Sequence, residues 1–230
     1  MTEMPPAPLL VILCALLGLA VAPVALHITR RLLPTLELGR SRWQSLVSFS
    51  LTAFLFAAMA WRFGWSWVLP AFFFLSATGL VLSWIDLQHK LLPNKVVLPS
   101  LGIGFVLLLL DAGMNQRWGN LLAAVIGCAV TFVIYLILAL ISPRGMGMGD
   151  VKLSAPLGMY LGYLSAGHLI LGIVLGFIAG AVTSVLLVTS GLAGRKTVLP
   201  FGPSMFLGCV LTVLWGVELG RIIMPTVFSR

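Results

Sequence analysis

Apolar residues fill eight segments of the chain, and short polar stretches separate them. An α-helix needs about 20 apolar residues to cross a bilayer, and most of these segments approach that length. The sequence therefore predicts an all-α integral membrane protein, a polytopic bundle of about eight transmembrane helices forming one membrane-embedded domain over residues 1–230. The predicted crossings are Leu9–Ile28, Leu46–Trp61, Trp67–Ile85, Val96–Leu110, Leu121–Ile141, Val151–Leu164, Leu169–Ser190 and Met205–Met224.

The composition agrees with lipid as the solvent of this chain. Of its 230 residues, 60% are hydrophobic and 9% are charged, and the mean hydropathy is +1.11, which excludes a water-soluble globular domain. Cys14, Cys128 and Cys209 all lie in apolar segments without CxxC spacing, so neither a disulfide framework nor a structural zinc site is expected. The first segment follows Glu3 without a basic residue, which predicts a retained helix rather than a cleaved signal peptide.

The 14 Lys and Arg residues are scattered singly or in pairs, so the net charge of +8 indicates membrane topology rather than nucleic-acid binding. Basic residues accumulate in cytoplasmic loops, and with eight crossings they divide ten to four between the two faces. This asymmetry predicts that both termini lie outside. The cytoplasmic set is Arg30, Arg31, Arg40, Arg42, Lys90, Lys95, Arg144, Lys152, Arg195 and Lys196, and the outer set is Arg62, Arg117, Arg221 and Arg230.

Four of the six acidic residues have ordinary explanations. Glu3, Glu37 and Asp111 are assigned to a terminus or to loops, where water solvates them. Glu218 lies within the last apolar segment, and we interpret it as an interfacial residue that pairs with Arg221 three positions later.

The other two acids lie at the membrane edge. Asp86 ends the third crossing and Asp150 begins the sixth, so the predicted topology places both at the cytoplasmic face. Asp150 follows alternating glycines at Gly145, Gly147 and Gly149, a pattern that disfavours helix. We expect this stretch to be extended and able to pair, main chain to main chain, with an unwound substrate segment.

Two carboxylates in a shielded site share one proton, an arrangement that suits acid–base catalysis. The ionised member can accept a proton from an attacking water while the protonated member donates to the developing oxyanion. Amide hydrolysis is the reaction that such a pair serves best. The sequence has no HExxH or GxSxG motif, and neither a metal nor a cofactor is expected.

Three further features are interpreted structurally. Gly172, Gly176 and Gly180 form small-xxx-small repeats that let a neighbouring helix approach closely. The segment 200–203, Pro-Phe-Gly-Pro, either breaks the chain before the last helix or shapes the mouth of the site. Trp61, Trp65, Trp67 and Trp118 suit an aromatic belt on the outer side.

The two aspartate segments resemble those of the type IV prepilin peptidase family. Gly147-Met148-Gly149-Asp150 matches its GxGD motif and is followed by Val151-Lys152-Leu153. Asp86, followed by His89-Lys90-Leu91-Leu92-Pro93-Asn94, is similar to its first aspartate segment, and the Pro-Phe-Gly-Pro segment matches a further signature. The resemblance covers the chain from about Phe72 onward.

The resemblance implies a protease of the bacterial inner membrane whose active site faces the cytoplasm. It implies Asp86 and Asp150 as catalytic residues and Gly147, Gly149 and Lys152 as parts of an active-site loop. The implied partners are a prepilin or pseudopilin substrate and the lipid bilayer, with no nucleic acid. Longer members carry paired CxxC zinc motifs in their first cytoplasmic loop, linked to N-methylation of the trimmed pilin. The corresponding loop, Thr29–Ser45, has no cysteine, so peptidase activity alone is expected.

Two other classes of function are compatible with a polytopic membrane protein. A proton- or ion-coupled transporter would use intramembrane carboxylates as a proton relay, although transporters hold such charges near the midplane at matched positions of two repeats. A non-catalytic membrane scaffold would give no reason for the glycine-rich entry to Asp150.

Overall fold

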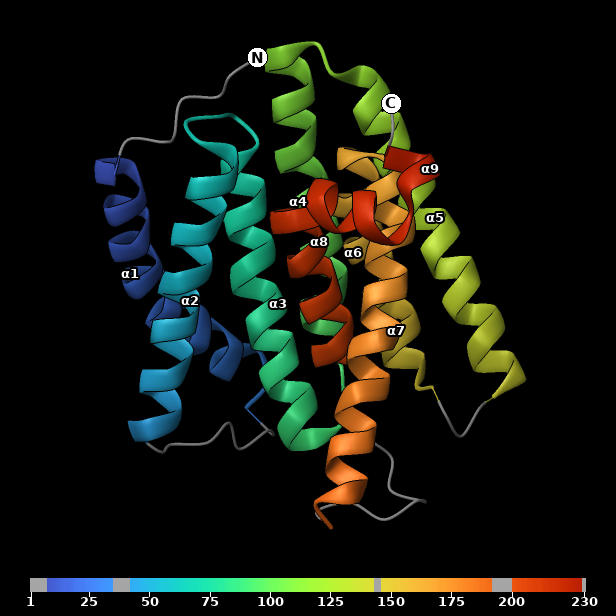
Figure 1. Cartoon of the computed structure of the whole chain (residues 1–230). Coiled ribbons are helices and arrows are strands. Elements are labelled where there is room, and N and C mark those ends of the chain that lie inside the picture. Colours follow the sequence, from blue (N-terminus) through green and yellow to red (C-terminus); the bar gives the residue numbers. More distant parts are fainter. Residues whose placement is uncertain (1–7, 35–41, 143–145, 192–199, 229–230) are drawn as a thin grey trace.

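The structure, a computed structural model, describes residues 8–34, 42–142, 146–191 and 200–228, and within these ranges it contains helices and no strand. Eight long helices pack into one bundle, with a short ninth helix at the C-terminal end (Figure 1). The helices are α1 (Pro8–Leu32), α2 (Arg42–Phe63), α3 (Leu69–His89), α4 (Asn94–Asn115), α5 (Trp118–Ile141), α6 (Met148–Leu164), α7 (Ala166–Thr189), α8 (Gly202–Ile223) and α9 (Pro225–Phe228).

The predicted polytopic bundle is confirmed, because each predicted crossing corresponds to one long helix. In the described ranges, seven of these helices are long and apolar enough to cross a membrane. The remaining one, α6, has 17 residues and is therefore roughly 25 Å long, somewhat less than the ~30 Å hydrocarbon core. Successive helices run up and down the bundle, so α1 begins at the same end at which α8 and α9 finish (Figure 1).

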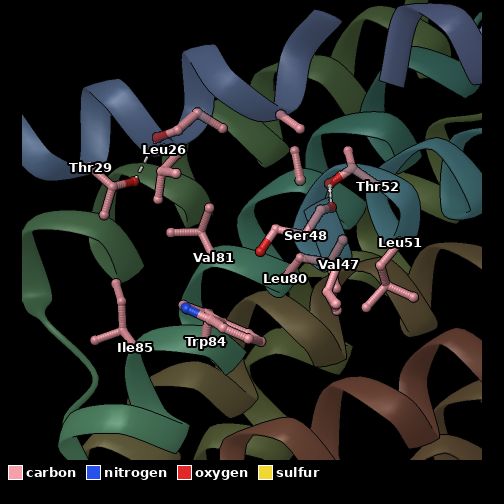
Figure 2. Close-up of a pocket in the computed structure, with 13 residues that line it drawn as sticks. Leu26, Thr29, Val47, Ser48, Leu51, Thr52, Leu80, Val81, Trp84 and Ile85 are labelled. Atoms are coloured by element: carbon pink, nitrogen blue, oxygen red, sulfur yellow. Dashed lines mark hydrogen bonds between the residues drawn. The ribbon is translucent and has the colours of Figure 1, made fainter. Parts of the chain in front are cut away.

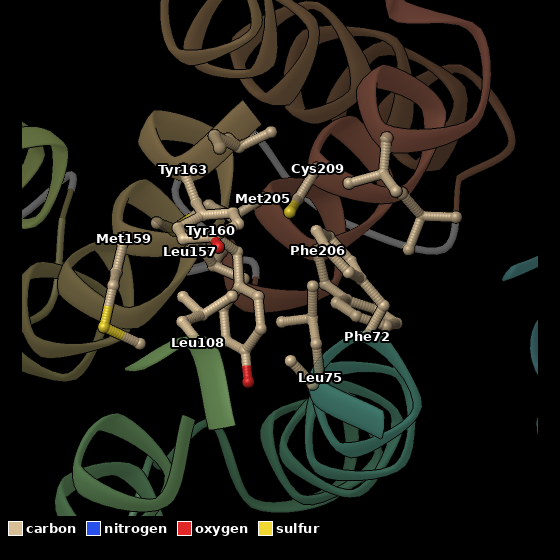
Figure 3. Close-up of a cluster of buried hydrophobic side chains, with 14 of the residues drawn as sticks. Phe72, Leu75, Leu108, Leu157, Met159, Tyr160, Tyr163, Met205, Phe206 and Cys209 are labelled. Carbon is tan, nitrogen blue, oxygen red and sulfur yellow. The ribbon is translucent and has the colours of Figure 1, made fainter. Parts of the chain in front are cut away.

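The helix α6 is the centre of the bundle. Most of its residues are buried, and it contacts α4, α5, α7 and α8. Tyr160 packs edge to face on Phe72 of α3, with 5.4 Å between the ring centroids, and Phe206 and Cys209 of α8 complete this part of the core (Figure 3). Protein therefore surrounds α6, which explains how a helix shorter than the hydrocarbon core is accommodated there.

Close contacts between small residues hold the neighbouring helices together. The Thr131 hydroxyl on α5 donates to the Ser154 carbonyl of α6 at 3.0 Å, and a Cβ atom on Gly158 would lie only 2.0 Å from the Thr131 oxygen. On α8, a Cβ on Gly208 would lie 2.3 Å from the Gly176 nitrogen of α7. The predicted close approach of a helix to the α7 glycines is confirmed at Gly176.

The end of the bundle where α2 and α4 finish carries exposed tryptophans. Trp61, Trp65, Trp67 and Trp118 are each more than half exposed, as expected for side chains of a membrane–water interface. Glu218 is also exposed, in agreement with an interfacial residue, but it forms no ion pair with Arg221.

The expectation that Asp111 is a solvated loop residue is wrong. Asp111 lies in the last part of α4 and is completely buried. Its carboxylate accepts hydrogen bonds from the Tyr163 hydroxyl and, at 2.7 Å, from the Asn115 amide, and Arg117 Nη1 lies 3.8 Å away. The hydrophobic pattern placed Asp111 just beyond a predicted crossing, whereas α4 continues for five residues to Asn115 and turns this side chain inward.

Replacing this carboxylate should destabilise the fold. Asp111→Ala would leave the buried Tyr163 hydroxyl without its acceptor, and an unsatisfied buried hydrogen-bonding group costs about 1–3 kcal/mol. We expect a lower unfolding midpoint in detergent, followed by circular dichroism. Glu218→Ala removes an exposed acid and is the matched control. Equal midpoints for the two variants would contradict the structural role of Asp111.

Candidate active site

Asp86 lies in the last turn of α3, and its side chain is only 4% exposed. The helix ends at Lys90, which adopts a left-handed conformation (φ 51°) and whose N–H donates to the Asp86 carbonyl. One carboxylate oxygen, Oδ2, accepts the backbone N–H of Gly202 at 3.0 Å. Because Gly202 is the first residue of α8, the carboxylate sits at a helix N-terminus, where free N–H groups favour a negative charge.

The Pro-Phe-Gly-Pro segment therefore shapes the site as well as interrupting the chain. A Cβ atom on Gly202 would lie 2.8 Å from Asp86 Oδ2, so a larger residue at this position would displace the carboxylate. The sequence alone left open whether this segment only breaks the chain before the last helix or also shapes the mouth of the site.

Asp150 lies in the first turn of α6 and is 8% exposed. Its Oδ2 accepts the Gly147 N–H at 3.1 Å, the capping arrangement of a helix start. The glycine-rich stretch differs from the expected extended strand, because α6 already begins at Met148, although Gly147 immediately before it has extended dihedral angles. Gly145, the first glycine of the pattern, lies outside the described residues. A helix is favoured over a strand at this point, because the N–H groups at its N-terminal end can donate to the Asp150 side chain.

One cleft of about 440 Å³ joins the two aspartates, and their carboxylates are close enough to interact electrostatically. All five residues selected from the sequence line this cleft, so the structure brings together segments that are far apart in the chain. The other lining residues come from the α3–α4 connection and from the start of α6. The cleft is lined by Asp86, Lys90, Leu91, Leu92, Pro93, Asn94, Gly147, Met148, Gly149, Asp150 and Lys152.

Lys152 crosses the cleft to α4, where its Nζ donates to Asn94 Oδ1 at 3.0 Å. Gly149 faces the same connection, and a Cβ atom there would lie 2.9 Å from Leu92 Cβ. Asn94 and Leu92 were quoted in the sequence pattern without a role, and the structure places both at the cleft.

Tyr135 is a neighbour of the site that the sequence did not indicate. It is buried on α5, interacts electrostatically with Asp150, and stacks on Phe177 with 5.5 Å between the ring centroids. The ring of Phe201, the residue before Gly202, also lies near Tyr135, with 6.4 Å between the two ring centroids. An isolated tyrosine in an apolar segment gives no signal that distinguishes it from the surrounding core.

The described residues contain no cluster of three or more His, Cys, Asp or Glu side chains that could hold a metal ion. The groups available for chemistry in the cleft include two buried carboxylates, the lysines Lys90 and Lys152, and backbone amides. They can hold a water molecule between an acid and a base.

The fold and the site define a polytopic membrane protein with a two-aspartate cleft at one end of its bundle. Residues 73–217 match the type IV leader peptidase family, and the chain belongs to this family.

Three similar proteins each carry the name prepilin leader peptidase/N-methyltransferase. That of Stutzerimonas stutzeri is 35% identical over 69% of this chain and 54% of its own length. That of Pseudomonas aeruginosa is 34% identical over 74% of this chain and 58% of its own length. That of Bacillus subtilis is 32% identical over 72% of this chain and 64% of its own length. The chain thus spans little more than half the length of these relatives. No solved structure gives a significant match to it.

Proposed function

We propose that this chain is an intramembrane aspartic endopeptidase that removes the leader peptide of type IV prepilins or pseudopilins. The observation that carries the proposal is the pair of buried carboxylates, Asp86 and Asp150, in one cleft. Membership of the type IV leader peptidase family supports the reaction, and the names of the relatives support the substrate.

Each step of hydrolysis has a candidate group in the cleft. One aspartate, ionised, accepts a proton from water as the water oxygen attacks the scissile carbonyl carbon. The other, protonated, donates to the carbonyl oxygen as negative charge develops on it. Collapse of the tetrahedral intermediate breaks the C–N bond, and a proton returns to the leaving amine. The two aspartates share one proton throughout and act as a unit.

Substrate main chain is held, in this proposal, by the parts of the cleft that lack bulky side chains. Gly147 is exposed and Gly149 is partly exposed, so a substrate can reach their backbone. Lys152 can exchange its bond to Asn94 for one to a substrate carbonyl or carboxylate. Methyl transfer is not part of the proposal, although the relatives' names include it, because the loop Thr29–Ser45 has no cysteine for a zinc site.

The proposed location is the inner membrane of a bacterium, with the cleft facing the cytoplasm. The ten-to-four division of basic residues supports this orientation. Reporter fusions after Lys95 should therefore be active only as cytoplasmic reporters, and fusions after Arg117 only as external ones. The reverse pattern would place the aspartates on the wrong face for a cytoplasmic leader.

Asp86→Asn and Asp150→Asn should each abolish leader cleavage, measured by intact mass after incubation with a prepilin. Asparagine keeps the size of aspartate but cannot exchange the proton, and a single acid–base group contributes about 10²- to 10⁴-fold. The double variant should be hardly slower than either single one. The same mass spectra would show a transferred methyl group, which we do not expect.

Glu218→Gln is the control, because this acid is exposed and remote from the cleft. It should cleave at the wild-type rate. An Asn variant that retains near wild-type cleavage would exclude that aspartate from the chemistry, and a wild-type protein without cleavage would favour the transporter.

Gly149→Val should reduce cleavage strongly while the protein remains folded in the membrane. The new side chain would press on Leu92 and narrow the cleft between the two aspartate segments. Gly102→Val is the matched control, because a Cβ there meets no atom within 4 Å. Comparable cleavage by the two variants, at equal abundance, would show that the close packing of Gly149 on Leu92 is not needed for cleavage.

A further inference from the structure

A second cavity, distinct from the active-site cleft, lies between α1, α3 and α4. This crevice has a volume of about 280 Å³ and is lined largely by apolar side chains, among them Val24 and Ile28 of α1, Val81 of α3, and Pro99 and Ile103 of α4. Val24, Ile28 and Ile103 are 55%, 51% and 47% exposed, so the crevice is open at the surface of the bundle. In the membrane, its mouth faces lipid.

The crevice arises from the way in which α1 is attached. Helix α1 packs mainly against α2, and at Gly18 a Cβ atom would lie 2.8 Å from Ala53 Cα. Its contact with α3 is lighter, and the side chains that line the gap include the small residues Ala25, Ala77 and Ser100. A gap therefore remains between α1 and α4.

Figure 2 shows the neighbouring cavity of about 50 Å³ between α1, α2 and α3, which shares Thr29 and Val81 with the crevice. On this side of α3, the neighbouring helices therefore leave space that protein side chains do not fill.

The polar atoms in the crevice wall are already satisfied. Thr29, Thr78 and Ser100 each donate their hydroxyl to a carbonyl of their own helix at 2.7 Å. The dashed line at Thr29 in Figure 2 is one of these bonds. A polar ligand would find no unpaired partner among these hydroxyls, whereas a hydrocarbon chain would make favourable contacts along the apolar wall.

The crevice ends at a positive charge. Lys95 lines it at the start of α4, is exposed, and makes no ion pair with the other described residues. Basic side chains near a membrane surface attract anionic lipid headgroups by about 1 kcal/mol each. An apolar channel with a lysine at its end is complementary to one acyl chain joined to a phosphate.

We propose that the crevice is a binding site for one anionic phospholipid, with an acyl chain between α1 and α4 and the headgroup phosphate at Lys95. The lipid would fill the space beside Val81 and so support α3, the helix that carries Asp86. The lipid site does not rest on the proposed peptidase function.

Native mass spectrometry of the purified protein tests the proposal. Phosphatidylglycerol and phosphatidylcholine with identical acyl chains are titrated separately into detergent micelles. The wild type should retain one phosphatidylglycerol, bound about fivefold more tightly than phosphatidylcholine, the factor that corresponds to one basic residue. Lys95→Gln should bring the two lipids to equal affinity. Val24→Trp and Ile103→Trp, which fill the mouth, should each lose both lipids.

Two control variants separate the crevice from the rest of the surface. Ile137→Trp adds the same ring at a 50% exposed position of α5, and Arg221→Gln removes a basic residue from α8. Both should bind like the wild type.

Unchanged lipid retention in both tryptophan variants would overturn the site, and so would equal binding of the two lipids to the wild type. Displacement of the lipid by the apolar segment of a prepilin would also overturn it, because the crevice would then be a peptide site.

Discussion

The structure depends on keeping two carboxylates together where little water reaches them. Each group loses hydration on burial, and each raises the cost of ionising the other. One oxygen of each carboxylate accepts a backbone N–H at the start of a helix. Asp86 accepts from Gly202, the first residue of α8, and Asp150 accepts from Gly147, the residue before α6. Backbone N–H groups need no side-chain ordering and bring no counter-charge. They hold the carboxylates in place without neutralising the pair.

The helix that carries Asp150, α6, is short, mostly buried and held at several points along its length. It is joined to α5 through Thr131 and Ser154, and its far end is held by the buried Asp111. Near Asp150, Lys152 connects α6 to the first residue of α4. Displacement of α6 along its axis would break all three contacts.

Much of this arrangement could be predicted from the sequence, because hydrophobic length determines the crossings and the number of crossings determines which residues share a face. The meeting of Asp86 and Asp150 followed from that count. The role of Gly202 did not, because a turn before a helix can face any neighbour. Asp111 was misjudged because hydropathy does not show where a helix ends beyond its apolar part. The glycine pattern before Asp150 suggested an extended chain, and capping by the carboxylate favoured a helix instead.

A glycine packs closely near each of the two aspartates, Gly202 against Asp86 and Gly149 beside Asp150. A side chain at Gly202 would press on Asp86, and one at Gly149 would press on Leu92. At Gly149, which lines the cleft, backbone rather than a side chain therefore borders it. Backbone recognises an extended peptide through its amides, which all peptides share, and side chains add selectivity only where they reach. On the proposed function, the residues near the dyad would hold any unwound segment in register. Discrimination between leaders would then fall to the parts of the cleft that do carry side chains, among them Lys90 and Lys152.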